Sequence, residues 1–470
     1  MFKTAVFTRY TTYIVGILTT AINLLMITYY LDVNEFAVWG IASSIVYIFS
    51  QLGQLTYVQY IDKYFPNMSF EETKIKIYQF LKTIILFSPV WLSFLFLLDG
   101  LGYFDKFLIE NIYILFLLLV TLIVLESGIE ITSKYMLALQ KTQSYDLNEF
   151  LILKLLRSFL FFGFLYNGFS IYHLFFVSIL LRSSFLLSIL SKNEKNIRSL
   201  VVNIISASVF KNNFENLKYT SVAFAIKTLQ ITFLNVIFLI YSNFSESTEI
   251  ATYSLGILLI NNLRPVISSF SSLLTPKISK RANIGNESSS FLQLTSFLNT
   301  FLSSLFICGS LLLFLFEEYI NDYFIDYEGN VIFTIFLSII AATIMSIYHP
   351  VLLLVKFSEK ERTLLKRISI SYVFCLLLFY IAQLIELNNL ILFYILFELL
   401  NLIFSRNIYL NTFGKTKIFL FSCTYFLSIF MILAYSFLRI NNFTLIILLV
   451  LACYLIDYSR FKKRKFDLNI

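Results

Sequence analysis

Long apolar stretches alternate with short polar segments along the whole chain. The stretch "YILFLLLVTL" (113–122), for example, is interrupted only by a tyrosine and a threonine. About 20 apolar residues are what an α-helix needs to cross a bilayer. The pattern predicts about fourteen spans, at 7–31, 37–61, 80–98, 112–133, 146–166, 169–191, 219–241, 251–274, 291–316, 331–355, 368–387, 390–410, 418–438 and 443–458. The sequence therefore predicts an all-α integral membrane protein, with the short last stretch also readable as an interfacial segment.

The composition supports this prediction. Of the 470 residues, 58% are hydrophobic and 14% are charged, and the mean hydropathy is +0.80. A soluble protein of this length would need far more polar surface to cover its core. The first stretch is longer than the apolar region of a signal peptide and lacks a cleavage pattern, which indicates a retained span. The four cysteines lie in apolar stretches without metal-ligand spacing, so we expect no metal site and no cofactor.

The basic residues predict the orientation. The chain has 36 lysines and arginines against 28 acidic residues, a formal net charge of +8. With the N-terminus in the cytoplasm, most basic residues flank the cytoplasmic ends of the spans, as the positive-inside rule requires. The tail "RFKKRKF" (460–466) is then also cytoplasmic. We expect it to contact anionic membrane lipids and not nucleic acid.

The segments between the spans are short. The longest outer loop is 317–330 and the longest inner loop is 192–218, neither of which is long enough to fold as a separate domain. The sequence contains no P-loop, HExxH, GxSxG or CxxC pattern. We therefore expect the function to lie within the bilayer, and the sequence does not favour an enzyme.

The chain carries signs of an internal duplication. "RYTT" (9–12) opens the first span and "KYTS" (218–221) opens the seventh, and Pro66 and Pro276 follow at nearly equal distances. Because both copies begin on the cytoplasmic side, the two halves are expected to be related by a pseudo-twofold axis along the membrane normal. The predicted divisions are two six-helix bundles at 1–210 and 211–411, followed by two extra helices and the basic tail at 412–470. Such a duplication is compatible with a functional monomer.

Polar residues fall on one face of the first, second, seventh and eighth spans. Serine and threonine on such a face are explained by helix–helix packing. Lys227 and Arg264 fit that explanation less well, because a charge near the middle of a span costs about 2.5–3.5 kcal/mol. Two alternatives remain open: a water-filled cationic cavity between the bundles, or a buried structural pair. A cationic cavity suits an anionic substrate such as a phosphate, which accepts both lysine and arginine.

Two glutamates, Glu126 and Glu130, lie four positions apart in the fourth span, on one helical face. A hairpin with the fifth span centred near residue 144 brings Glu130 opposite Arg157, which predicts a structural ion pair. Glu126 has no partner of its own that the sequence can name, so three alternatives stay open: it shares Arg157, it forms a buried hydrogen bond, or it is protonated and carries a coupling proton. Glu398 in the twelfth span is the second candidate for ion coupling.

Two segments carry a resemblance to a known family. The segment "LDVNEFAVWGIASSIVYIFSQLGQLTYVQYIDKYFP" (31–66) resembles the first hairpin of the polysaccharide-transporter branch of the multidrug/oligosaccharidyl-lipid/polysaccharide exporter superfamily. In that family a Glu-Phe-Gly or similar sequence fills the short acidic loop, whereas here Ala37 replaces the usual glycine and Gly40 follows. The segment "YMLALQKTQSY" (135–145), which leads into the basic fifth span, is also similar to the family.

The resemblance implies a flippase similar to the O-antigen flippases of bacterial inner membranes. Such a protein moves a polyprenyl-pyrophosphate-linked oligosaccharide, an O-antigen or capsule repeat unit, to the outer leaflet by alternating access, in some members driven by H⁺ or Na⁺. Under this resemblance Lys227 and Arg264 would bind the pyrophosphate or an acidic sugar, and Arg9 and Lys218 would receive the substrate at the cytoplasmic side. The residues expected to hydrogen-bond sugar hydroxyls are Asn23, Gln51, Gln54, Gln230 and Asn261.

Two other functions stay open. A multidrug antiporter of the same superfamily would carry mostly cations and would need acidic residues within the bilayer, for which Glu126 and Glu398 are the candidates. A membrane-embedded polysaccharide polymerase or glycosyltransferase also has many spans. Such enzymes usually carry a sizeable outer loop with catalytic residues, and the 317–330 loop is short.

Overall fold

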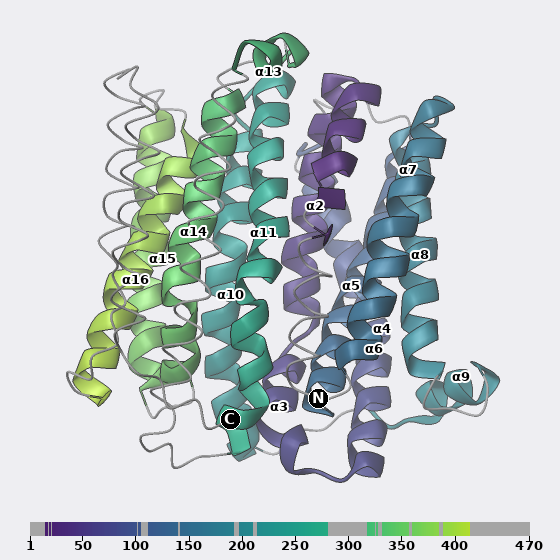
Figure 1. Cartoon of the computed structure of the whole chain (residues 1–470), viewed down its shortest axis with the longest axis vertical. Coiled ribbons are helices and arrows are strands. Elements are labelled where there is room, and N and C mark those ends of the chain that lie inside the picture. The colour runs from purple at the N-terminus through teal and green to yellow at the C-terminus, as the bar shows by residue number, and fades with distance from the viewer. Residues whose placement is uncertain are drawn as a thin grey trace. The chain divides into compact units, whose positions relative to one another are not determined.

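The structure is a computed structural model in which helices make up nearly all of the described chain (Figure 1). No strand occurs among the described residues. The described residues are 15–16, 18–19, 21–100, 102–104, 111–139, 142–191, 197–209, 214–280, 317–324, 326–327, 331–356, 360–384 and 389–413. The predicted spans at 291–316, 418–438 and 443–458 lie outside these residues.

The contacts divide the chain into two compact units. The first contains the described residues up to Ser254 together with Thr275–Lys280, and the second contains Leu255–Leu274 and the described residues from 317 onward. The helices of the first unit are α2 (Val33–Gly53), α3 (Tyr57–Tyr64), η1 (Phe65–Asn67), α4 (Phe70–Gly100), α5 (Ile112–Ala138), α6 (Thr142–Asn148), η2 (Glu149–Leu156), α7 (Arg157–Tyr166), α8 (Ile171–Ser191), α9 (Ile197–Ser206) and α10 (Phe214–Ser242). Helix α11 (Ser247–Lys280) belongs partly to each unit. The second unit also contains α13 (Glu317–Tyr323), α14 (Val331–Lys356), α15 (Glu361–Leu384) and α16 (Leu390–Phe413). The divisions predicted at 1–210, 211–411 and 412–470 stay a prediction.

Six helices of the described part are long and apolar enough to cross a membrane. They are Val33–Gly53, Phe70–Gly100, Ile112–Ala138, Ile171–Ser191, Thr220–Ser242 and Glu361–Leu384, and shorter apolar helices cover Ala21–Tyr30, Val331–Ala342 and Leu390–Ser405. Each of them overlaps a span that the sequence predicted. The chain is thus a multi-pass helical membrane protein, and the full arrangement of about fourteen helices stays a prediction.

The central and peripheral helices of the first unit differ in burial. Of the apolar window of α2, 72% is buried, against 22% for α4. Helix α4 exposes Ile85, Leu86, Val90 and Leu97, which is the surface expected of a helix that faces lipid. Helix α2 therefore forms part of the core, and its Ser44 and Ser50 are buried inside the unit.

Helices α2 and α5 approach each other closely at small residues. The Ser127 hydroxyl on α5 donates to the backbone carbonyl of Ser50 on α2 at 3.0 Å. A Cβ atom added at Gly53 would lie only 2.7 Å from the Ser127 hydroxyl oxygen. Small and hydroxyl residues allow this close approach between membrane helices. The contact fixes the register of α5 against α2 one turn before Glu130.

The second predicted span, 37–61, is broken in the structure. Helix α2 ends at Gly53 and α3 begins at Tyr57, and between them Leu55 has a φ of 49°. This left-handed conformation costs about 1–2 kcal/mol for a residue with a side chain. A stacked contact between Tyr57 and Phe80, with ring centroids 4.4 Å apart, helps to hold α3 in place after the break. The break places Gln54 outside the regular helix, next to the polar cluster described below.

In the second unit, α16 packs against α14 and α15. Glu398, Asn401 and Ser405 lie on one face of α16, and each is at most 1% exposed. A polar row is thus buried within this unit.

Candidate functional site

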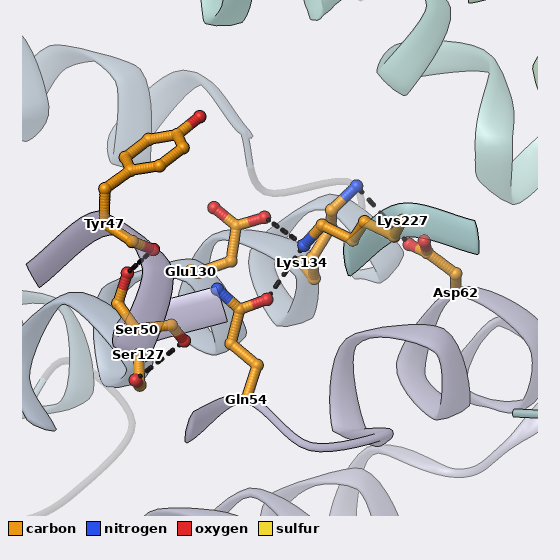
Figure 2. A network of polar contacts seen from close by, with 8 residues as sticks. All are labelled: Tyr47, Ser50, Gln54, Asp62, Ser127, Glu130, Lys134 and Lys227. Atoms are coloured by element: carbon orange, nitrogen blue, oxygen red, sulfur yellow. Dashed lines mark hydrogen bonds and ion pairs between the residues drawn. The ribbon is translucent and has the colours of Figure 1, made fainter. Parts of the chain in front are cut away.

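Lys227 on α10 is the centre of a polar cluster in the first unit (Figure 2). Its ammonium group donates to Gln54 Oε1 at 2.8 Å and to Glu130 Oε1 at 3.1 Å. The side chain of Lys227 is 16% exposed and that of Glu130 is 36% exposed. We call Gln54, Glu130 and Lys227 the Lys227 cluster. It joins α5 and α10 to the break between α2 and α3, three places that are far apart in the sequence.

The local structure explains how these side chains meet. The break after Gly53 turns Gln54 toward the cluster. The hydrogen bond from Ser127 to the Ser50 carbonyl fixes where Glu130 of α5 lies along α2. Gln54 is only 2% exposed. Its Oε1 accepts from Lys227, whereas its Nε2 has no hydrogen-bond partner among the described residues. The buried Nε2 donor of Gln54 is thus available to a ligand that binds beside Lys227.

A second ion pair continues the Lys227 cluster along α5. Lys134 lies one turn after Glu130, and its Nζ is 3.7 Å from Asp62 Oδ1 on α3. Lys134 and Lys227 both attract the Glu130 carboxylate electrostatically. Figure 2 shows both ammonium groups between the two carboxylates, with Glu130 joined to Lys227 and Asp62 joined to Lys134. The Glu130 carboxylate therefore contacts Lys227 and is also attracted by Lys134.

Further amides predicted from the sequence lie on the same helices or nearby. Gln51 precedes Gln54 by three residues on α2, and Gln230 follows Lys227 by three residues on α10. Asn23 and Gln230 are 7% and 8% exposed. Within the described residues, Asn23 Oδ1, Gln51 Oε1 and Gln230 Nε2 have no hydrogen-bond partner. Because a buried polar atom without a partner is costly, these atoms are suited to bind water or a polar ligand.

A different cluster surrounds the other glutamate of α5. The Arg182 guanidinium on α8 contacts Glu126 Oε1 through both Nε and Nη2. Arg157 at the start of α7 lies close enough to interact with both charges, and its guanidinium lies 4.7 Å from the Phe161 ring centroid. We call Glu126, Arg157 and Arg182 the Arg182 cluster. Glu126 is thus a paired carboxylate in this structure.

The structure gives Glu130 a different partner from the expected Arg157. The expectation placed the turn of the hairpin near residue 144, but α5 ends at Ala138 and α6 already begins at Thr142. The next segment, η2, is a π-helix, which changes the direction in which later side chains point. Within it Lys154 pairs with Glu149 at 3.4 Å. Because of these differences from the expected hairpin, Arg157 lies near Glu126, and Glu130 contacts Lys227 on α10.

The sequence did not predict the pairing of Glu126 with Arg182. A usable signal existed, because the predicted spans 112–133 and 169–191 run in the same direction. Glu126 and Arg182 lie at nearly the same distance from the starts of these two spans. Opposite charges at matching depth in parallel spans are candidates for an ion pair.

The remaining predicted residues are placed less fully. Arg264 lies in α11 and Lys218 in α10, but their side chains are outside the description, and Arg9 lies outside the described residues. Asn261 lies on the part of α11 that belongs to the second unit. Glu398 on α16 belongs to the same unit. Among the described residues, no three histidine, cysteine or acidic side chains gather as a metal site would require.

Comparison with solved structures identifies the class of the fold. No protein-family model and no curated protein matches the sequence. The lipid II flippase MurJ, in an inward closed conformation, matches with a TM-score of 0.60 at 14% identity, covering 98% of each chain. The eukaryotic MATE transporter AtDTX14 matches with a TM-score of 0.51 at 11% identity, covering 85% of this chain and 91% of its own.

Both neighbours belong to the superfamily that the sequence resembles. At these identities the likeness shows a shared fold. The fold is therefore that of the MATE and lipid-flippase transporters, and it extends over nearly the whole chain. The polysaccharide branch, the substrate and the direction of transport are matters for proposal.

Proposed function

We propose that this protein is a flippase for a polyprenyl-pyrophosphate-linked oligosaccharide. The observation that carries the proposal is the mostly buried Lys227, whose ammonium group contacts one amide and one carboxylate inside a fold shared with a lipid II flippase. Lysine binds phosphate as a point charge. Buried amides with unused polar atoms, such as Gln54 and Gln230, are suited to sugar hydroxyls and phosphate oxygens.

In this proposal the oligosaccharide crosses a cationic central cavity by alternating access, and the lipid tail stays in the bilayer. The substrate is an O-antigen or capsule repeat unit, and it moves from the cytoplasmic to the outer leaflet of a bacterial inner membrane, with both termini in the cytoplasm. Arg264 adds a second cation for the pyrophosphate or an acidic sugar. Arg9 and Lys218 receive the lipid-linked substrate first, and Asn23, Gln51 and Asn261 contact the sugar.

Ion coupling is a separate part of the proposal. Glu398 is 1% exposed and shares its helical face with the buried Asn401 and Ser405, a set of oxygen atoms suited to a proton or Na⁺. Glu126 is the other candidate. Its carboxylate contacts Arg182 in this structure.

The test is flipping of a short-chain polyprenyl-pyrophosphate oligosaccharide in proteoliposomes. Lys227→Ala should slow flipping by about 10- to 100-fold, since a hydrogen bond to a charged group contributes about 1.5–3 kcal/mol. Lys154→Ala is the matched control, because the Lys154 side chain is 18% exposed and pairs with Glu149 in η2. Wild-type protein that moves no lipid-linked sugar but exports organic cations would favour the multidrug antiporter instead.

A further inference from the structure

Glu130 occupies the position at Lys227 that an anionic substrate would need. Its Oε1 lies 3.1 Å from Lys227 Nζ, which is hydrogen-bonding distance. A ligand phosphate cannot take the same direction on Lys227 while this carboxylate remains. An anion bound elsewhere on Lys227 would still lie beside this carboxylate, and the repulsion between like charges favours movement of Glu130 away from Lys227.

We propose that Glu130 is an exchangeable counter-anion, which neutralises Lys227 in the empty transporter and is transferred to Lys134 when the substrate pyrophosphate binds. The proposal rests on the proposed function, because it assumes that the ligand of Lys227 is an anionic headgroup. It assigns Glu130 and Lys134 a role in substrate selection. The sequence alone suggested only a structural ion pair for Glu130.

Lys134 can receive the carboxylate because it is incompletely engaged by Asp62. The distance from Lys134 Nζ to Asp62 Oδ1 is 3.7 Å, longer than a hydrogen bond. A lysine ammonium group has three donors, so Lys134 can serve Asp62 and Glu130 at the same time. Lys134 follows Glu130 by four residues, the favourable order for an ion pair on a helix.

The exchange avoids an unpaired charge at every stage. Removing one partner of a buried ion pair leaves an uncompensated charge, which is strongly unfavourable. In the empty state Glu130 neutralises Lys227. In the bound state the pyrophosphate neutralises Lys227, and Lys134 retains Glu130. Each lysine therefore keeps a neighbouring anion throughout.

Gln54 supplies the second observation that points to an anionic ligand. Its Oε1 already accepts from Lys227, and its buried Nε2 has no partner in the described part of the chain. A phosphate oxygen placed beside Lys227 could accept from this amide as well. A neutral sugar cannot replace the charge of Glu130, so the exchange selects ligands that carry an anion.

The exchange is tested by titrating purified full-length protein in detergent with inorganic pyrophosphate, using isothermal calorimetry. Glu130→Gln should lower the Kd by about tenfold, because it removes the competing charge and keeps the shape. Glu149→Gln is the matched control, since Glu149 also pairs with a lysine and is 19% exposed, and it should leave the Kd unchanged. An unchanged or higher Kd for Glu130→Gln would overturn the proposal.

The role of Lys134 requires a double-mutant cycle. Lys134→Met should raise the pyrophosphate Kd by about tenfold in the wild-type background, because Glu130 then has no second cation. In the Glu130→Gln background the same change should have little effect. Equal effects in both backgrounds would contradict a transfer of Glu130 to Lys134.

Should Glu130→Gln fail to fold, Glu130→Asp replaces it as the test. This side chain is shorter by one methylene and should lower the pyrophosphate Kd by a smaller factor. A raised Kd would oppose the proposal.

The outcome is separable from that of the proposed function. Pyrophosphate binding that strengthens in Glu130→Gln supports the exchange even if no lipid-linked sugar is flipped. Conversely, flipping that depends on Lys227 with no change in affinity in Glu130→Gln keeps the proposed function and rejects the exchange. A parallel titration with glucuronate separates the sources of the anion. A gain in affinity for glucuronate alone would assign Lys227 to an acidic sugar and reject pyrophosphate.

Discussion

The two glutamates of α5 are one helical turn apart and have cationic partners of different chemistry. Glu130 contacts the ammonium group of Lys227, together with the amide of Gln54. Glu126 contacts two nitrogens of the Arg182 guanidinium, with Arg157 nearby. An ammonium group is a compact point charge on a flexible chain, whereas a guanidinium is a rigid planar fork. The same acidic residue type thus takes part in two different kinds of ion pair.

Solvent exposure does not explain the difference. The Lys227 and Arg182 side chains are 16% and 17% exposed, and those of Glu130 and Glu126 are 36% and 29% exposed. The distinction lies in the geometry of the cation. Each glutamate has a second cation nearby, Lys134 for Glu130 and Arg157 for Glu126, but the contact with a flexible lysine is more easily exchanged than the contact with two nitrogens of a guanidinium. The comparison suggests a ligand-binding role for the Lys227 cluster and a structural role for the Arg182 cluster.

The largest expected effect on stability tests that assignment directly. Arg182→Met should lower the free energy of unfolding by about 2 kcal/mol, because it removes the main partner of a largely buried carboxylate. Lys227→Met should cost less, about 1 kcal/mol, because it removes a single ammonium contact to a carboxylate that is 36% exposed. Thermal unfolding of both variants in detergent measures the difference. The comparison fails if Lys227→Met is the more destabilising change.

A smaller effect is expected where α2 meets α5. Gly53→Ala places a methyl group 2.7 Å from the Ser127 hydroxyl oxygen and should destabilise the protein by about 1–2 kcal/mol through overpacking. Because the same contact fixes the position of Glu130 along α5 relative to α2, flipping of the lipid-linked oligosaccharide should also slow. Adding Ser127→Ala should restore part of the stability, as measured by thermal unfolding. A double variant no better than Gly53→Ala would show that the crowding lies elsewhere, for example at Trp91.

The smallest expected effect concerns the break that positions Gln54. Leu55→Gly removes a left-handed strain of about 1–2 kcal/mol and loses a similar amount of partly buried side-chain surface. The net change in unfolding free energy should be within about 1 kcal/mol. Leu55→Val, whose branched side chain tolerates this conformation poorly, should be clearly destabilising. Comparable stability of the two variants would show that the φ of Leu55 is not important.

Hydropathy alone predicted the helical membrane class and the positions of the apolar helices, because the bilayer requires long apolar spans. The positions of polar residues on helical faces and the family resemblance also singled out Lys227, Gln54, Glu126 and Glu130. It could not pair them, since pairing depends on where a hairpin turns and where a helix breaks. The turn after Ala138 and the break near Leu55 are irregularities of a few residues without a strong sequence signal. Arg264, which the sequence ranked equal to Lys227, has no described side chain to compare.

The π-helix η2 has a consequence for how this sequence tolerates insertions and deletions. With i→i+5 hydrogen bonds, a π-helix holds more residues per turn than an α-helix, so the segment Glu149–Leu156 acts like an insertion absorbed without a loop. Deleting one residue there would let the helix return to α geometry. Each residue of an α-helix turns the chain by about 100°. Because the wide turns already absorb the extra residue, such a deletion would keep the span intact and leave Arg157 facing nearly the same way, whereas a deletion within the α-helical part of the span would rotate all later residues.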